Sequence, residues 1–172
     1  RGAMSSTHTP AGAPAPLRIG LFAHLADHRD AVEQTYLDYL DLFVHAEALG
    51  VESAWVRQFH LAKPDAGRLG GLPSPFVLLS AAAARTSQIV LGTSIVTLPL
   101  EAPLRVAEDA AVLSRISGGR VELGIGSGGT PSSFPPCGRD PRDRPAIFAR
   151  HRDQLVAALR GDVLTEDGGR LY

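Results

Sequence analysis

The histidines are the residues of this sequence that can transfer protons near neutral pH. His60 closes the stretch VESAWVRQFH, so its imidazole would lie just past an apolar run, where a general base can reach a bound molecule. Taken alone, the residue is more simply explained as a loop histidine bonded to the backbone. His28, His45 and His151 do not share metal-ligand spacing, so we predict no metal site.

Glycines gather at the end of a second apolar run, VELGIGSGG. Gly124, Gly126, Ser127 and Gly128 would let a planar ring approach the backbone closely and would offer amide donors to it. The alternative is that the glycine pair at 128–129 only forms a flexible loop. A GxGxG pattern after a strand also resembles dinucleotide binding, but prolines follow and no helix begins at the third glycine.

The stretch from 88 to 127 indicates how such apolar runs are arranged. Residues 89–96 and 121–125 are rich in Val, Ile and Leu and nearly free of charge, which is typical of strands buried on both faces. Residues 104–116 between them have helical spacing, with one face formed by Val106, Ala110, Leu113 and Ile116. Strand, helix and strand at this spacing predict a right-handed βαβ crossover with parallel strands.

The same alternation continues on both sides of this unit. We predict strands at 17–23 and 51–56, helices at 30–49, 75–86 and 145–160, and long loops at 57–73 and 127–145. These elements make four βα units, which are half of an eight-stranded (β/α)8 TIM barrel. The alternative α/β arrangement is an open parallel sheet with helices on both faces.

The composition is that of an ordinary soluble globular protein, with 44% hydrophobic residues and a net charge of -1 over 172 residues. This balance predicts binding to neither nucleic acid nor membrane. The single cysteine, Cys137, predicts no internal disulfide and favours a reducing, cytoplasmic compartment. Residues 1–16 are rich in Ser, Ala and Pro and are predicted to be disordered, beginning with a cloning remnant before Met4. Residues 17–172 then form one domain.

Three stretches resemble one known family. They are ALGVESAWVRQFH at 48–60, LGTSIVTLPLEAPLRVAEDAAVLSRISGGRVELGIGSG at 91–128, and CGRDPRDRPAIFARH at 137–151. Over about residues 17–165 the chain resembles the N-terminal half of the bacterial luciferase-like, flavin-dependent monooxygenases. The resemblance implies a (β/α)8 barrel with flavin at the carboxyl ends of the strands.

The resemblance also implies an activity. A monooxygenase of this family would use reduced FMN and dioxygen to oxidise a small organic substrate. NAD(P)H would supply the electrons through a flavin reductase, and a homodimer is expected. Two alternatives stay open: hydride transfer with the deazaflavin F420, and a flavin-binding or partner-completed half barrel without catalysis.

Roles for individual residues follow from the same resemblance. Ser94 and Ile95 lie where the family often has a non-proline cis peptide facing the flavin; otherwise they are ordinary strand residues. His60 becomes a candidate catalytic residue. The predicted cofactor-binding residues are Ser94, Ile95, Gly124, Gly126, Ser127 and Gly128. His24 and Phe59 would line the substrate pocket.

The second-strand motif departs from the family pattern. It usually ends Glu-His-His, whereas this chain has Gln58, Phe59 and His60. One titratable side chain therefore stands where the family usually has more, which favours packing of Phe59 on flavin or substrate.

The length of the chain is short for the family. The chain would end before a fifth strand, whereas the usual phosphate site of the barrel follows strands seven and eight. A half barrel also leaves open edge strands. The chain would then be a fragment of a longer protein, one half of a two-part barrel, or a half-size relative that dimerises. We favour the fragment, because the final GGRLY resembles a point where full-length relatives continue.

Overall fold

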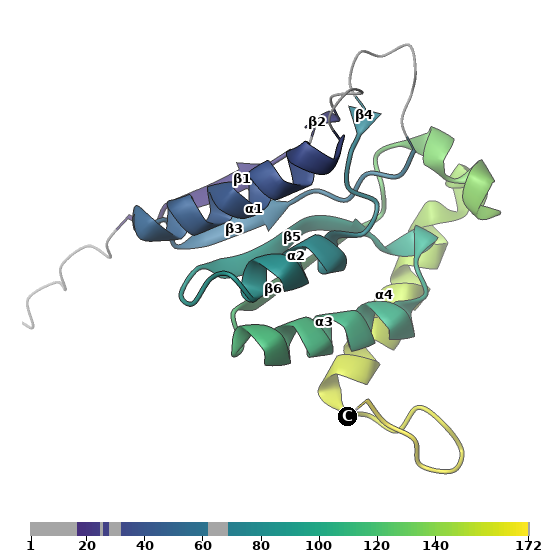
Figure 1. Cartoon of the computed structure of the whole chain (residues 1–172). Coiled ribbons are helices and arrows are strands. Elements are labelled where there is room, and N and C mark those ends of the chain that lie inside the picture. The colour runs from purple at the N-terminus through teal and green to yellow at the C-terminus, as the bar shows by residue number, and fades with distance from the viewer. Residues whose placement is uncertain (1–16, 25, 28–31, 62–68, 172) are drawn as a thin grey trace, which may run out of the picture.

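The computed structural model describes residues 17–24, 26–27, 32–61 and 69–171, and its main feature is a sheet of four parallel strands (Figure 1). The strands are β1 (Gly20–Ala23), β3 (Ser53–Val56), β5 (Val90–Thr97) and β6 (Val121–Gly126), in the order β1-β3-β5-β6. Each successive strand is added on the same side, as in a (β/α)8 barrel, whereas a doubly wound sheet reverses direction. The predicted α/β half barrel is therefore confirmed.

Within the described residues, four α-helices connect and extend the strands: α1 (Val32–Ala48), α2 (Pro75–Ala83), α3 (Pro103–Ser117) and α4 (Arg144–Arg160). Successive helices contact one another along the sheet (Figure 1). The core between the sheet, α1 and α2 includes the fully buried side chains of Phe43, Leu79 and Leu91. Of the described helices, none is long and apolar enough to cross a membrane.

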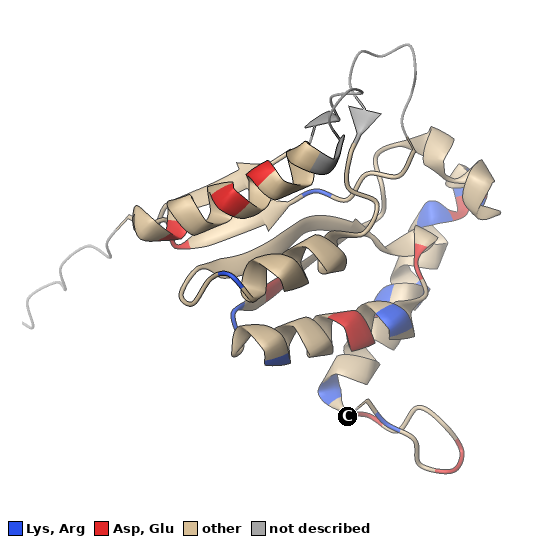
Figure 2. Ribbon diagram, in the orientation of Figure 1, with Lys and Arg blue, Asp and Glu red and all other residues tan. Residues whose placement is uncertain are grey.

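Charged residues lie mainly on the helices and the loops (Figure 2). Acidic residues lie along α1, and α3 and α4 each carry both acidic and basic residues. Such mixing agrees with the net charge of -1.

The buried face of α3 differs slightly from the one predicted. Val106, Ala110 and Leu113 are buried, but Ile116 is 52% exposed and Ser117 takes its place. The buried positions 106, 110, 113 and 117 are spaced by four, three and four residues, which keeps them on one face of the helix. Residue 116 precedes residue 117 by one position and is therefore rotated away from that buried face. The prediction for Ile116 was wrong for this reason.

The connections contain structure that the sequence patterns did not predict. Within the expected loop at 57–73, β4 (Leu69–Gly70) pairs antiparallel with β2 (Ala26–Asp27). The loop at 127–145 contains three 3-10 turns: η3 (Pro131–Ser133), η4 (Pro135–Cys137) and η5 (Pro141–Asp143). A further turn, η2 (Leu98–Leu100), joins β5 to α3. The predicted disordered tail at 1–16 lies outside the described residues.

One row of residues crosses the sheet: Phe22, Trp55, Gly92 and Glu122 are partners in the strand register. The Trp55 ring lies against Gly92, where an added Cβ would be 2.3 Å from ring atom Cε3. Phe22 at the β1 edge is 53% exposed. The row is thus packed in the middle of the sheet and open at its edge.

Candidate functional site

A pocket of about 90 Å³ opens where β3, β5 and β6 end, at the carboxyl edge of the sheet. Barrel enzymes place their sites at this edge. The pocket brings together four of the predicted site residues: Phe59, His60, Ile95 and Gly128. Its other lining residues are Arg57, Gln58, Thr97, Leu100, Gly129, Thr130 and Ser133.

Other predicted residues are not part of the pocket lining. Ser94 and Ser127 are exposed, and the peptide bond between Ser94 and Ile95 is cis. His24 is also exposed, and its carbonyl oxygen accepts a hydrogen bond of 2.9 Å from the Tyr39 hydroxyl.

The glycines of β6 accommodate the neighbouring strand. An added Cβ on Gly124 would be 2.1 Å from the Thr93 carbonyl oxygen, and one on Gly126 would be 2.9 Å from the Ile95 side chain. Close approach of the β5 backbone therefore requires glycine at position 124, whereas a Cβ at position 126 would displace the Ile95 side chain. Cofactor binding by Gly124 and Gly126 stays a prediction.

An irregularity in β5 places Ile95 at the pocket. The register of β5 and β6 shifts between Thr93 and Val96, so that β5 has one residue more than β6 over this span. The buried Thr93 hydroxyl bridges the gap, since it donates to the Gly124 carbonyl at 2.9 Å and accepts from the Gly124 amide at 3.0 Å.

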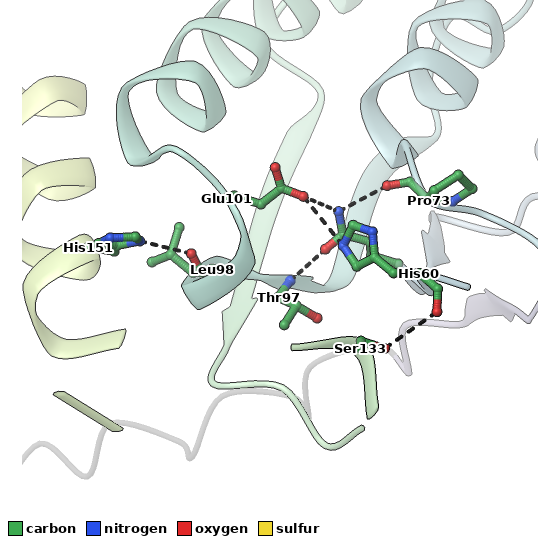
Figure 3. A network of polar contacts seen from close by, with 8 residues as sticks. His60, Pro73, Thr97, Leu98, Glu101, Ser133 and His151 are labelled. Carbon is green, nitrogen blue, oxygen red and sulfur yellow. Dashed lines mark hydrogen bonds and ion pairs between the residues drawn. The ribbon is translucent and has the colours of Figure 1, made fainter. Parts of the chain in front are cut away.

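Gln58 lines the pocket and is the centre of a polar network. Figure 3 shows its partners Pro73, Thr97 and Glu101. Gln58 is only 6% exposed, and both the nitrogen and the oxygen of its side-chain amide form hydrogen bonds. Nε2 donates to the Pro73 carbonyl at 3.0 Å and to Glu101 Oε1 at 2.6 Å. Oε1 accepts from the Thr97 amide at 2.7 Å. The network ties the ends of β3 and β5 to the turn before α3.

His60 lies against the same carboxylate. Its Nε2 is 3.5 Å from Glu101 Oε1, with 20% of the histidine side chain and 30% of the glutamate side chain exposed. Nε2 is itself buried and has no hydrogen-bond partner at this separation. The imidazole is thus paired with an acid but not firmly bonded to it.

The loop after β6 forms the other wall. Gly128 has a φ of +85°, and an added Cβ there would be 2.6 Å from Thr97 Cγ2, so glycine is required at this position on both grounds. Arg144 at the start of α4 donates to the Gly128 carbonyl at 3.2 Å. The buried Ser133 hydroxyl approaches the His60 carbonyl at 3.5 Å.

Arg57 adds a positive charge to the pocket. Its guanidinium carbon lies 5.1 Å from the centroid of the Phe59 ring, which is a cation–π geometry. Phe59 therefore packs on a neighbouring side chain while it lines the pocket.

The sequence patterns did not single out several residues of the site, among them Arg57, Thr97, Glu101 and Ser133. A usable signal existed for Glu101, which is the one charged residue in the apolar run TLPLEAPL. His151 is structural, because it is buried and its Nδ1 lies 3.1 Å from the Leu98 carbonyl oxygen (Figure 3). In the described ranges, no three His, Cys, Asp or Glu residues gather as metal ligands.

Comparison with known proteins identifies relatives over nearly the whole chain. The family model described as luciferase-like monooxygenase matches residues 16–171. A 4-hydroxyprotoasukamycin monooxygenase from Streptomyces nodosus subsp. asukaensis is 37% identical over 123 residues, which are 72% of this chain and 32% of that protein. An F420-dependent glucose-6-phosphate dehydrogenase from Amycolatopsis mediterranei is 33% identical over 119 residues, 69% of this chain and 35% of that protein.

A solved structure shows the same fold. The oxygenating constituent of 3,6-diketocamphane monooxygenase from Pseudomonas putida, in complex with FMN, superimposes with a TM-score of 0.77 at 22% identity. The match covers 90% of this chain and 42% of that one. The chain thus spans between about a third and a half of the length of these proteins. It belongs to the luciferase-like monooxygenase family.

Proposed function

We propose that the protein containing this chain is a flavin-dependent monooxygenase that uses reduced FMN and dioxygen on a small organic substrate. The observation that carries the proposal is the pocket at the carboxyl edge of the sheet, where an apolar wall, a histidine and a glycine loop converge. Monooxygenases among the relatives support the reaction type, and the FMN complex of the Pseudomonas putida protein supports the cofactor.

The residues of the pocket fit one edge of a flavin ring. Phe59 and Ile95 offer apolar surface to a flat ring, and the backbone at 128–130 lines the opposite wall. The buried, unbonded Nε2 of His60 shows that the site holds a polar group whose hydrogen bonding is incomplete. The volume of about 90 Å³ admits only part of such a ring, so the remainder would extend outside the pocket.

Each side chain then has a defined task. Reduced flavin, when bound, would supply the two electrons with which one oxygen atom enters the substrate and the other leaves as water. His60 would give or take a proton at the substrate. Phe59 and Ile95 would exclude water, and Arg57 would favour a substrate that carries negative charge.

The partners and setting remain predictions. A separate flavin reductase that uses NAD(P)H is favoured because the Pseudomonas putida relative is named as an oxygenating constituent. We also propose a homodimer, which sedimentation of the intact protein would check. Cytoplasmic location is favoured by a single cysteine, Cys137, that is free and exposed.

Hydride transfer with F420 is the second candidate. The relative from Amycolatopsis mediterranei is named as an F420-dependent dehydrogenase, and the likeness to it is only slightly lower than to the monooxygenase. In that reaction a hydride would pass between substrate and deazaflavin, and dioxygen would not be consumed.

One experiment separates the candidates, including a flavin-binding protein without catalysis. The intact protein is supplied with reduced FMN, ¹⁸O-labelled dioxygen and a panel of aldehydes, ketones, terpenes and aromatic acids, and products are analysed by mass spectrometry. We expect incorporation of one labelled oxygen atom. Substrate-dependent reduction of F420 without incorporation would favour the dehydrogenase. FMN binding without any turnover would leave the non-catalytic alternative, and absence of FMN binding would contradict the proposal.

A further inference from the structure

We propose that Glu101 is the positioning partner of His60: its carboxylate keeps the imidazole proton on Nε2, so that Nδ1 is the ring nitrogen that exchanges protons with a bound substrate. The proposal deepens the proposed function and rests on it for the role of His60. Glu101 itself does not line the pocket, so it would act through the histidine.

The geometry around Nε2 supports this assignment. Nε2 is buried, lacks a hydrogen-bond partner and faces Glu101 Oε1 at 3.5 Å. An ionised carboxylate can only accept hydrogen bonds, so a favourable contact requires a proton on Nε2. A small approach of the two groups would complete the hydrogen bond when the pocket is filled.

The carboxylate is held in place by a second contact. Gln58 Nε2 donates to the same Glu101 oxygen at 2.6 Å, and Gln58 is itself fixed by Thr97 and Pro73 (Figure 3). Glu101 therefore cannot turn away from His60 without breaking the network. This restraint distinguishes it from a surface carboxylate that meets a histidine by chance.

The network also explains the departure from Glu-His-His. In this chain Gln58 Nε2 lies 2.6 Å from Glu101 Oε1. A glutamate at position 58 would put a second carboxylate in place of that amide, next to the carboxylate of Glu101. Two carboxylates at that separation repel one another unless they share a proton. In this chain the acid comes from the turn before α3, and a neutral amide at position 58 holds it.

The other charged groups of the site are arginines. Arg57 lies over the Phe59 ring, and Arg144 donates to the Gly128 carbonyl. In the portion of the chain that the structure describes, Glu101 is the acidic side chain paired with His60. Removal of its carboxylate would take away the acidic partner that the structure gives to the imidazole.

The direct test is the position of the ring proton. The intact protein is labelled with ¹⁵N-histidine, long-range ¹H–¹⁵N spectra are recorded at alkaline pH, and the His60 signal is identified by its loss in His60→Gln. We expect the Nε2–H tautomer in the wild type and in Glu101→Gln, whose amide oxygen can still accept. Glu101→Leu should populate both tautomers, whereas the control Glu108→Leu on α3 should keep the wild-type signal.

Two results would overturn the proposal. One is an Nδ1–H tautomer in the wild-type protein, which decides the question even if Glu101→Leu fails to fold. The other is an unchanged Nε2–H tautomer in folded Glu101→Leu. Neither result depends on turnover, so failure of this proposal is distinguishable from failure of the proposed monooxygenase activity.

Kinetics supply a second readout once a substrate is found. We expect Glu101→Leu to lower kcat at least tenfold with KM within about twofold, because substrate contacts are retained and proton transfer is impaired. Glu101→Gln should recover part of the loss. An unchanged kcat in folded Glu101→Leu would contradict the positioning role.

Discussion

At the scale of single residues, the site depends on a contact between two segments far apart in the chain. Gln58 and Glu101 are separated by 43 positions, yet the hydrogen bond between them joins the end of β3 to the turn before α3. The sequence identified His60 and Phe59 from a motif at the end of a strand. A lone charge in an apolar run marked Glu101 as unusual, but no local pattern indicates that Gln58 and His60 are the distant side chains it meets.

Gln58→Glu should destabilise the protein. A carboxylate at this position cannot donate to the Pro73 carbonyl or to Glu101, and it adds a like charge next to Glu101. We expect a loss of about 1–3 kcal/mol in the free energy of unfolding, measured by urea denaturation. The double variant Gln58→Glu/Glu101→Gln should recover part of this loss.

A matched control lies on α1. Gln34 Nε2 also donates to a carboxylate, Asp38 Oδ1, at 2.7 Å, but this pair is exposed. Gln34→Glu should change stability by no more than about 0.5 kcal/mol. Equal losses for Gln58→Glu and Gln34→Glu would show that burial of the network has no energetic consequence.

At the scale of elements, the extra residue of β5 between Thr93 and Val96 sets how the carboxyl ends of β5 and β6 are aligned. The continuous apolar run at 89–96 predicted the strand itself, and the extra residue opposite β6 has no counterpart in that pattern. The two-residue strands β2 and β4 were missed for a similar reason, since two residues cannot display a periodicity.

Thr93 should contribute to stability through its hydroxyl group. Thr93→Val keeps the shape of the side chain but leaves the Gly124 amide and carbonyl without their partner. We expect a cost of about 1–3 kcal/mol in the free energy of unfolding, measured by thermal or urea denaturation. Thr93→Ser keeps the hydroxyl and loses one methyl group, with a cost of about 0.8 kcal/mol. A smaller loss for Val than for Ser would contradict this role.

Glu47, near the end of α1, binds the backbone of the turn before β5. Its carboxylate accepts hydrogen bonds from the amides of Ser87, Gln88 and Ile89 at 2.8–3.0 Å. Partial burial alone would raise the pKa of Glu47, but the hydrogen bonds outweigh it and lower the pKa from 4.5 to about 2. A lowered pKa in the folded state means that this contribution is complete above pH 4.5 and is lost as the pH falls toward 2.

Glu47→Gln should therefore flatten the dependence of stability on pH in this acid range. The measurement is urea denaturation at a series of pH values between about 2 and 6, with the free energy of unfolding plotted against pH. Glu166→Gln, in the exposed C-terminal segment, is the matched control and should retain the wild-type slope. Identical slopes for both variants would mean that Glu47 is not the group responsible.

At the scale of the whole molecule, the alternation of strands and helices predicted the architecture, and the strand order showed how it is wound. The side of the sheet that carries Phe22 is left open at its β1 edge, as expected of a barrel segment. Because the chain spans only part of its relatives' length, the remaining walls of a flavin site would come from other strands. The sequence of this chain contains no information on those walls.

Under the proposed function, flavin would lie over the carboxyl ends of β3, β5 and β6. This position can be tested by titrating FMN into the intact wild-type protein and into Ser94→Tyr while flavin fluorescence is recorded. Ser94 is exposed and precedes Ile95, which lines the pocket, so we expect a tyrosine there to compete with the ring for space without disturbing the core. Val112→Tyr, at a residue of α3 that is 40% exposed, is the control.

We predict that Ser94→Tyr binds FMN at least tenfold more weakly than the wild type, which corresponds to about 1.4 kcal/mol, and that Val112→Tyr keeps the wild-type affinity. Equal affinities of Ser94→Tyr and the wild type for FMN would contradict this position of the flavin.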